Sequence, residues 1–274
     1  MNKKNVKNIF VVLVYRNTQD VVELLDSIKT QVRDYKVIMV NNFYDDLTKT
    51  QFEDIATQYN CDFINCENRG YGAGNNTGIR FAQENYEFDY LFISNPDIVI
   101  KNFSQEILDC YSDGVIGTAI YNLQHVNQNP MLARNNKFAT KMLYIGQKKN
   151  ATTPLIVGKA IHKIERSCYK FITKNSMPKK RKVYQIHGSF LIFTRSAIDL
   201  IGAPYDEEMF LFGEEGYLAY LLNKQGIGTY YCPEIEVLHK EDGSMKFRND
   251  INEQCVKASI YFFEKYYFNI RGEV

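Results

Sequence analysis

The sequence predicts an α/β fold in which helices cover both faces of a mostly parallel, twisted sheet. Short apolar runs rich in β-branched residues, such as Asn8 to Tyr15, alternate with longer segments whose apolar residues have helical spacing. Polar residues directly follow several of these runs, as Arg16 and Asn17 follow the first. Strands that alternate with helices form parallel sheets, and such sheets bind ligands at the carboxyl ends of their strands.

The same reasoning assigns the elements along the chain. Apolar runs predict strands, and segments of helical periodicity predict the helices between them. The predicted strands cover residues 8–15, 36–40, 61–66, 90–93, 115–121 and 184–194, and the predicted helices cover residues 20–32, 47–59, 78–85, 103–111, 157–173, 195–201 and 259–268, with one more helix that begins at Glu214.

Composition limits the function classes. The chain has 274 residues, a formal net charge of +1 and 45% hydrophobic residues, which is ordinary for a globular protein and gives no case for a nucleic-acid partner. It contains no apolar run of about 18 residues, so we expect no membrane-spanning helix. The six cysteines are scattered without a CxxC pair, so we expect reduced thiols in a cytoplasmic protein.

One stretch delivers a carboxylate at the end of a strand. The segment from Asp89 to Ile100 contains an apolar run that stops at Ser94-Asn95-Pro96-Asp97. Proline cannot donate to a strand ladder, so the strand must end or bulge there. Taken alone, the segment is most simply a turn, because Asn, Pro and Asp all favour turns. A buried strand that ends in a carboxylate is also how α/β proteins present a group to a ligand.

A glycine-rich segment runs from Asn68 to Gly78. Its pattern is G-x-G-x-G instead of the G-x-G-x-x-G of dinucleotide-binding proteins, and it follows the third predicted strand instead of the first. We therefore reject a dinucleotide-binding interpretation. Two alternatives remain open, namely a flexible loop and a segment whose backbone N–H groups bind an anionic or polar ligand near a helix start.

Residues from about 124 to 182 are basic and contain a single acidic residue, Glu165. Within them, residues 157–173 predict a basic amphipathic helix. This helix could be solvated and cover the domain, or it could rest on an anionic membrane surface, and the excess of positive charge favours the membrane. The aromatic helix at residues 259–268 would either dock on the domain or lie at a membrane interface.

The polar motifs occur in a specific order along the chain. They are Tyr15-Arg16-Asn17, Asn41-Asn42, Asn68-x-Gly-Tyr-Gly with Asn76-x-Gly78, Asn95-Pro96-Asp97, Gly188-Ser189, Gly202-x-x-Tyr-Asp206, Phe210-Leu-Phe-Gly-Glu-Glu, and Pro233 with His239 and Gly243-Ser244. This order resembles that of the inverting family 2 glycosyltransferases, which have the Rossmann-like GT-A fold, and especially the rhamnosyltransferase-like members that build bacterial surface polysaccharides. The resemblance covers roughly residues 8–245.

The resemblance implies a metal site. In that family the Asp of the Asn-Pro-Asp segment lies next to the metal, so Asp97 would hold Mg²⁺ or Mn²⁺ against the diphosphate of a nucleotide sugar. His239 occupies the position of a histidine that also reaches the metal in some members. Hard cations take oxygen ligands and neutralise charge that grows on a leaving diphosphate. The imidazole slightly favours Mn²⁺ over Mg²⁺.

The resemblance also implies a general base and a donor pocket. The family's acidic pair, usually Glu-Asp, is Glu214-Glu215 here, so Glu215 is the base by position and Glu214 could share the role. The additional methylene of Glu moves the carboxylate by about 1.5 Å. Asn41 stands where the family usually has Asp, which leaves the nucleobase open. The implied donor-binding residues are Tyr15, Arg16, Asn17, Asn41, Asn42, Gly70, Tyr71, Asn76, Asn95, Asp97 and Gly188.

We therefore expect an inverting glycosyltransferase that moves a sugar from a UDP- or dTDP-linked donor to a lipid-linked or polysaccharide acceptor in bacterial capsule, O-antigen or cell-wall glycan synthesis. Its expected location is the cytoplasm, with peripheral contact to the inner face of the plasma membrane. The alternative is a catalytically impaired, nucleotide-binding scaffold in a polysaccharide assembly complex. A nucleotidyltransferase would carry a glycine-rich loop after the first strand, and Arg16-Asn17-Thr18 has no glycine.

The expected domain organisation follows from the same resemblance. Residues 1–245 would form the glycosyltransferase domain, with a basic and partly helical insertion at about 124–182. Residues 246–274 would form a C-terminal extension that contains the amphipathic aromatic helix.

Overall fold

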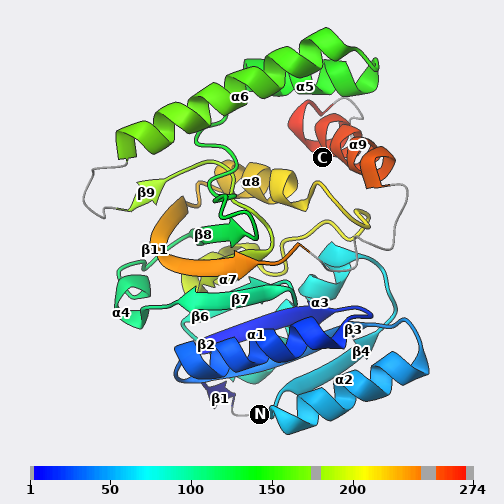
Figure 1. Ribbon diagram of the computed structural model, residues 1–274, viewed down its shortest axis with the longest axis vertical. Helices are drawn as coiled ribbons and strands as arrows, with labels where there is room; N and C mark the ends of the chain where they lie inside the picture. The colour runs from blue at the N-terminus through cyan, green and yellow to red at the C-terminus, as the bar shows by residue number, and fades with distance from the viewer. Residues whose placement is uncertain (1–2, 174–179, 242–250, 270–274) are drawn as a thin grey trace.

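The computed structural model describes residues 3–173, 180–241 and 251–269. Its centre is a mixed sheet with the strand order β4-β3-β2-β6-β10-β8-β11-β7, and the short strand β9 pairs with β11 (Figure 1). A separate small sheet pairs β1 (Lys4–Asn5) with β5 (Tyr86–Glu87). The strands of the main sheet are β2 (Asn8–Val14), β3 (Tyr35–Asn42), β4 (Asp62–Cys66), β6 (Tyr90–Ser94), β7 (Ile98–Asn102), β8 (Val115–Asn122), β9 (Arg181–Lys182), β10 (Phe190–Thr194) and β11 (Thr229–His239).

The strand directions confirm the predicted α/β class. Strands β4, β3, β2 and β6 are parallel neighbours, as expected for the first part of the chain. The second part adds a reversed strand, β10, which is antiparallel to both β6 and β8. Strand β11 is parallel to β8 but antiparallel to β7 and β9. Six of the nine described strands of the main sheet (β2, β3, β4, β6, β8 and β11) therefore point the same way, and its antiparallel pairs all involve β10 or β11.

Helices cover both faces of the sheet, as the sequence predicts. The side chains of β2 alternate between the faces, because Phe10 and Val12 join one buried cluster while Ile9 and Val11 join the other. The first cluster includes residues of α1 (Thr18–Gln31), α2 (Asp46–Gln58) and α4 (Gln105–Leu108). The second includes residues of α3 (Tyr71–Asn85), α7 (Arg195–Ile201) and α8 (Glu214–Lys224).

Two further helical units stand outside this sandwich. Helices α5 (Lys137–Lys148) and α6 (Thr152–Thr173) form an antiparallel pair at the end of the molecule opposite α1 and α2 (Figure 1). Helix α9 (Ile251–Phe262) continues into a π-helix, η2 (Phe263–Tyr267). Phe262 and Phe263 are buried, so the aromatic helix docks on the protein, which was one of its two predicted alternatives.

Several predicted boundaries are wrong. Helix α3 begins at Tyr71 and not near Gly78, so the glycine-rich segment is mostly helix and not a loop. Strand β10 begins at Phe190, because Nδ1 of His187 binds the hydroxyl and the backbone N–H of Ser189 in a local turn that precedes the strand. Helix α4 is a single turn, and α6 begins earlier than predicted, at Thr152.

Some predictions fall outside the described residues. These are the Gly243-Ser244 motif and the parts of the C-terminal extension at 246–250 and 270–274. Among the helices that the structure describes, none combines the length and the apolar character needed to cross a bilayer.

Candidate active site

Asp97 and His239 lie side by side at one edge of the sheet. Asp97 precedes β7 and His239 ends β11, and these two strands are antiparallel neighbours in which His239 pairs with Ile98. The Asp97 carboxylate Oδ2 is 3.5 Å from His239 Nε2, and the two residues are only 5% and 8% exposed. The backbone N–H of Lys240 also donates to the Asp97 carbonyl oxygen at 3.0 Å. Strand pairing therefore brings together the two residues predicted to bind a metal.

A hydrogen bond to Gln128 orients the His239 ring. The distance from His239 Nδ1 to Gln128 Oε1 is 3.0 Å. Because an amide oxygen can only accept, Nδ1 is the donor in this hydrogen bond, and Nε2 is the ring nitrogen that faces Asp97. A carboxylate oxygen and an imidazole nitrogen that lie this close, with the other ring nitrogen hydrogen-bonded to Gln128, fit Mn²⁺ or Mg²⁺ as ligands.

This pair would be only part of a metal coordination sphere. Across the described residues, no group of three or more His, Cys, Asp or Glu side chains could hold a metal ion. Mg²⁺ and Mn²⁺ commonly complete their coordination with water and with the phosphate oxygens of a substrate. Asp97 and His239 therefore fit a metal ion whose other ligands are water molecules and the phosphate oxygens of a nucleotide diphosphate.

The segment around Gly188 connects this pair to helix α8. The ring of His187 lies 5.4 Å from the ring of His239, between centroids. The Gly188 carbonyl accepts a hydrogen bond of 2.9 Å from the Tyr71 hydroxyl, and a Cβ placed on Gly188 would lie 3.0 Å from Glu215 Oε1. The absence of a side chain at Gly188 thus leaves room for the Glu215 carboxylate.

Asn95 belongs to the same region. Its backbone N–H donates to the Ser189 carbonyl oxygen at 2.8 Å, which ties the turn after β6 to the segment before β10. Burial lowers the pKa of His187 below its ordinary value, so this ring is neutral at pH 7.

Helix α8 begins with two glutamates in different environments. Gly213 precedes them with a positive φ of 86°, which turns the chain into the helix. Glu214 is 6% exposed, and its Oε1 has no hydrogen-bond partner among the described residues. Burial, together with the neighbouring Glu215, raises the pKa of Glu214 to about 8. Glu214 is therefore largely protonated at neutral pH, whereas Glu215 is half-buried and lies against Gly188.

A second group of predicted residues gathers at the carboxyl ends of β2 and β3. The Arg16 guanidinium lies over the Tyr44 ring at 3.8 Å and over the Tyr15 ring at 5.0 Å. Asn17 caps α1 by accepting from the backbone N–H of Gln19 at 3.1 Å. An arginine held between two aromatic rings offers flat surfaces suited to a nucleobase.

The predicted asparagines make hydrogen bonds within the protein. Asn41 donates to Asn65 Oδ1 at 2.7 Å, and Asn42 donates to the Gly70 carbonyl oxygen at 3.2 Å. Both polar ends of the Asn76 amide engage the backbone of Tyr205, at 2.7 and 3.0 Å. Asn76 therefore joins α3 to the segment before α8.

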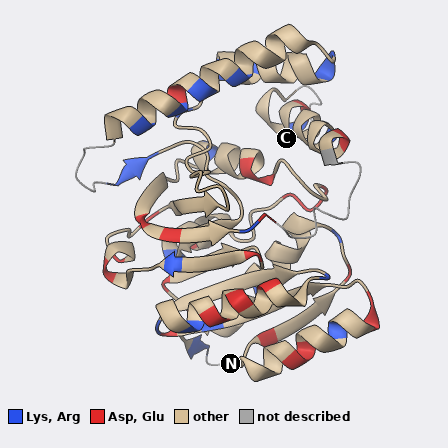
Figure 2. Ribbon diagram, in the orientation of Figure 1, with Lys and Arg blue, Asp and Glu red and all other residues tan. Residues whose placement is uncertain are grey.

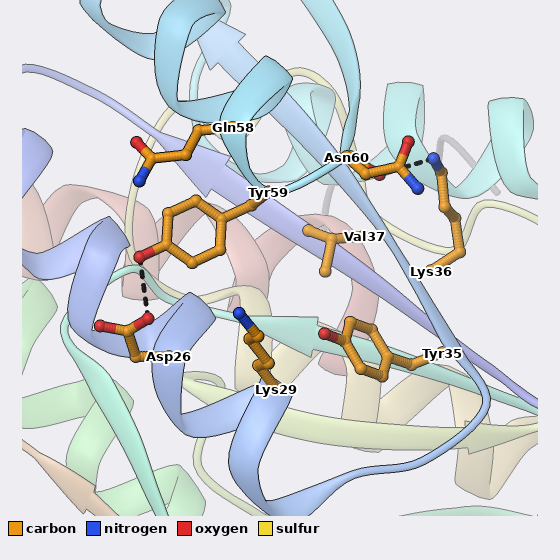
Figure 3. A pocket seen from close by; sticks show the side chains of 8 residues that line it. All are labelled: Asp26, Lys29, Tyr35, Lys36, Val37, Gln58, Tyr59 and Asn60. Atoms are coloured by element: carbon orange, nitrogen blue, oxygen red, sulfur yellow. Dashed lines mark hydrogen bonds between the residues drawn. The ribbon is translucent and has the colours of Figure 1, made fainter.

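A pocket of about 350 Å³ lies elsewhere, between α1, β3 and α2 (Figure 3). Its walls include Tyr35 and Val37 at the amino end of β3, with Tyr59 donating to Asp26 Oδ1 at 2.8 Å across it. Open α/β sheets bind ligands at the opposite, carboxyl ends of their strands. We therefore assign the candidate active site to the Asp97 edge and not to this pocket.

Sequence comparison identifies the family to which this chain belongs. Residues 9–198, which include β2 to β10 and the turn that carries Asp97, match the family model "Glycosyl transferase family 2". The chain belongs to glycosyl transferase family 2. No curated protein sequence matches this family 2 glycosyltransferase.

Solved structures support the same fold for this family 2 glycosyltransferase. The S. aureus protein TarS superimposes with a TM-score of 0.57 at 11% identity, over 94% of this chain and 40% of TarS. The structure of TarS residues 1–349 in complex with UDP gives 0.52 at 13% identity, over 85% and 60%. The structure of GalNAc-T7 with UDP, GalNAc and Mn²⁺ gives 0.59 at 12% identity, over 86% and 44%. The chain thus spans less than two thirds of each of these longer chains.

Sequence reasoning missed three residues of the site in this family 2 glycosyltransferase: Gln128, His187 and Tyr44. His187 had a signal, since it directly precedes the predicted Gly188. Tyr44 follows Asn41-Asn42 closely and is 45% exposed, so an exposed aromatic residue after a strand end could have marked it. Gln128 had no signal, because it lies in an irregular segment and reaches His239 only through the fold.

Proposed function

We propose that this protein is an inverting glycosyltransferase that takes its sugar from a UDP- or dTDP-linked donor. The observation that carries the proposal is the continuous series of contacts from Asp97 through His239 and His187 to Gly188 and Glu215. This series supports one site in which Asp97 would bind a metal and Glu215 would be the base. UDP in the structures of TarS and GalNAc-T7 supports a nucleotide donor.

In this proposal, Asp97 and His239 would hold the divalent ion, which when bound would offset the charge on the leaving diphosphate. The hydrogen bond from His239 to Gln128 would hold the ring with Nε2 toward Asp97, so that both residues could bind the ion. The cluster of Tyr15, Arg16 and Tyr44 would receive the nucleoside. Gly70, Tyr71 and Asn95 would line the donor pocket, with Asn41, Asn42 and Asn76 holding its walls.

Glu215 is the proposed base. It would accept the proton of the acceptor hydroxyl while that oxygen forms a bond to the anomeric carbon and the bond to the diphosphate breaks, so one displacement inverts the anomeric configuration. Glu214 is unsuited to this step, because it is buried and its pKa of about 8 keeps it protonated at neutral pH. Gly188 would position Glu215 by leaving space for its carboxylate.

We propose a lipid-linked or polysaccharide acceptor of bacterial surface glycan synthesis, met at the cytoplasmic face of the plasma membrane. The exposed basic helix α6 supports this placement. The resemblance to rhamnosyltransferase-like enzymes makes dTDP-rhamnose the first donor to test, beside other dTDP-, UDP- and GDP-linked sugars.

The test separates binding from transfer. Calorimetry with and without Mn²⁺ should detect one donor nucleotide, and Asp97→Ala should abolish the metal-dependent part of its binding. Glu215→Gln should keep donor affinity and lower the transfer rate about 10²- to 10⁴-fold, the usual contribution of a general base. Glu253→Gln, which removes an exposed carboxylate from α9, is the matched control and should change neither quantity.

A second function is favoured by the two departures from the family pattern, Asn41 and Glu215. It is a nucleotide-binding scaffold that has lost catalysis and acts in a polysaccharide assembly complex. Donor binding without transfer to any acceptor would support the scaffold, and turnover that depends on Glu215 would exclude it. Absence of binding by every nucleotide sugar would contradict both functions.

A further inference from the structure

Helix α6 has one face fixed against α5. A Cβ on its Gly158 would lie 2.8 Å from the Ala139 carbonyl oxygen, and a Cβ on Gly146 of α5 would lie 2.7 Å from the backbone nitrogen of Leu155. These close approaches leave no freedom for α6 to rotate about its axis. The opposite face of α6 is therefore held outward.

This outer face is apolar to an unusual degree. Ile156, Ile164, Phe171 and Ile172 are 60%, 62%, 83% and 72% exposed. Positions 156, 164 and 171 fall on one side of the helix, because they are separated by about two helical turns. Monomeric soluble proteins rarely expose so many large apolar side chains together, and such patches mark interaction sites.

A row of cations flanks the apolar stripe. Lys159 and Lys163 are exposed one turn apart. Lys170 is tied to the domain instead, because its ammonium donates to the Asn127 carbonyl oxygen at 3.2 Å. Figure 2 shows in blue the basic residues along α6. The single carboxylate of α5 and α6 is Glu165, which accepts a hydrogen bond of 2.9 Å from Asn136 and faces His162 at 3.5 Å. It is thus turned toward α5, and the outer face presents apolar groups and positive charge without a carboxylate.

We propose that the outer face of α6 binds the surface of an anionic phospholipid bilayer. The apolar stripe would enter the boundary between headgroups and acyl chains, with the helix axis in the plane of the membrane. The aliphatic stems of Lys159 and Lys163 lie beside this stripe, so their ammonium groups could reach lipid phosphates. The inference deepens the proposed function, on which it rests only for its biological purpose, since it names the surface at which a lipid-linked acceptor would be met.

The test measures binding to vesicles without any nucleotide sugar. The full chain should sediment with vesicles that contain phosphatidylglycerol and should bind pure phosphatidylcholine vesicles weakly. Replacing both Ile164 and Phe171 by Ser should lower the partition coefficient at least about tenfold, from the loss of buried apolar area. Replacing both Lys159 and Lys163 by Gln should lower it about 30-fold, since each charge contributes about fivefold, and high salt should weaken wild-type binding.

Matched controls use exposed residues of the same types outside α6. Leu47→Ser with Leu200→Ser removes two side chains that are 69% and 73% exposed, and Lys29→Gln with Lys101→Gln removes two exposed charges from α1 and β7. Both double variants should bind vesicles like the wild type. Because all the substituted residues lie at the surface, circular dichroism should give the same helix content for every variant.

Three outcomes would overturn the inference. The first is that the protein does not bind phosphatidylglycerol vesicles, and the second is that the α6 variants and their controls lose vesicle binding equally. The third is self-association in light scattering that Phe171→Ser abolishes, which would assign the face to a second copy of the chain. Failure of the proposed function can be told apart from failure of this inference. Binding to vesicles without binding to any nucleotide sugar would support the membrane surface and contradict the glycosyltransferase function.

Discussion

At the scale of single residues, Glu214 and Glu215 differ because successive side chains on a helix point about 100° apart. Glu214 is directed into the protein, where its Oε1 has no hydrogen-bond partner among the described residues, and Glu215 is directed at Gly188. A buried carboxyl next to a second carboxylate is costly to ionise, which explains why the pKa of Glu214 is raised to about 8. The two adjacent glutamates thus differ in their ability to accept a proton at neutral pH.

This difference predicts a pH dependence of stability. The pKa of Glu214 is about 8 in the folded state and 4.5 as its ordinary value, so the folded state binds more protons between these values. The free energy of unfolding should therefore fall as the pH rises through this window. Glu214→Gln removes this titration. The free energy of unfolding of the variant should therefore exceed that of the wild type by about 1.4 kcal/mol more for each pH unit of the window, and the difference should level off above about pH 8.

Urea unfolding at a series of pH values measures this prediction. Glu253→Gln is the control, because that carboxylate is exposed and its removal should leave the slope unchanged. A Glu214→Gln variant with the wild-type slope would show that another group carries the pH dependence.

At the scale of elements, the start of α3 depends on one glycine. Gly70 has φ +102° and ψ −179°, a backbone region open almost only to glycine. A Cβ there would lie 2.2 Å from the Phe210 carbonyl oxygen, the same atom that accepts the Tyr71 N–H at 2.8 Å. Gly70→Ala must therefore separate α3 from the segment before α8, and this segment leads to Glu215.

We expect Gly70→Ala to lower the free energy of unfolding by at least about 3 kcal/mol, as for other combinations of backbone strain and steric overlap. The matched control is Gly226→Ala, which also has a positive φ, +71°, but no atom within 4 Å of its new Cβ. It should cost only about 1–2 kcal/mol, the conformational penalty alone. Equal losses in urea unfolding would mean that the contact with Phe210 contributes nothing.

The same helix explains what sequence patterns could and could not predict. Apolar periodicity predicted the strands β2, β3 and β6 and thereby the polar residues at their ends. It placed the start of α3 too late, because glycines usually weaken helices. In α3 they serve packing instead, since a Cβ on Gly74 would lie 2.4 Å from Leu13 and one on Gly78 2.4 Å from Val11.

Long-range pairing was beyond the reach of local patterns. Asp97 and His239 lie close together because β7 pairs with β11 in antiparallel orientation, and no local periodicity encodes this pairing. Only the resemblance to family 2 glycosyltransferases placed these residues in one site. The hydrogen bond from His239 to Gln128 was invisible to both kinds of reasoning, because it depends on the path of an irregular segment.

At the scale of the whole molecule, the C-terminal helices contact two parts of the chain that are distant from each other in sequence. The hydroxyls of Tyr261 and Tyr266 donate to Asp206 at 2.9 and 2.7 Å, just before α8. Glu264 forms an ion pair with Lys148 of α5. The docked C-terminal segment therefore connects α5, against which the proposed membrane-binding helix α6 packs, to the segment that leads into the helix of the proposed base.

Phe262 is the residue through which this segment reaches the site. It is 6% exposed, and its ring lies 3.4 Å from the Cβ position of Gly216, directly after Glu215. Phe262→Ala should lower the free energy of unfolding by about 3–5 kcal/mol, as expected for a buried phenylalanine. In this variant α8 loses a packing partner, whereas the strands that hold Asp97 and His239 do not. The rate of sugar transfer should therefore fall, and the donor affinity should stay within about twofold of the wild-type value.

Urea unfolding and a comparison of transfer rate with donor affinity test this separation. Phe171→Ala is the matched control, since the ring of Phe171 is 83% exposed and its removal should change stability by less than about 0.5 kcal/mol. Phe262→Leu, which restores most of the buried volume, should recover most of the lost transfer rate. If donor affinity fell in parallel with transfer, the C-terminal segment would support the whole site and not the position of Glu215 alone.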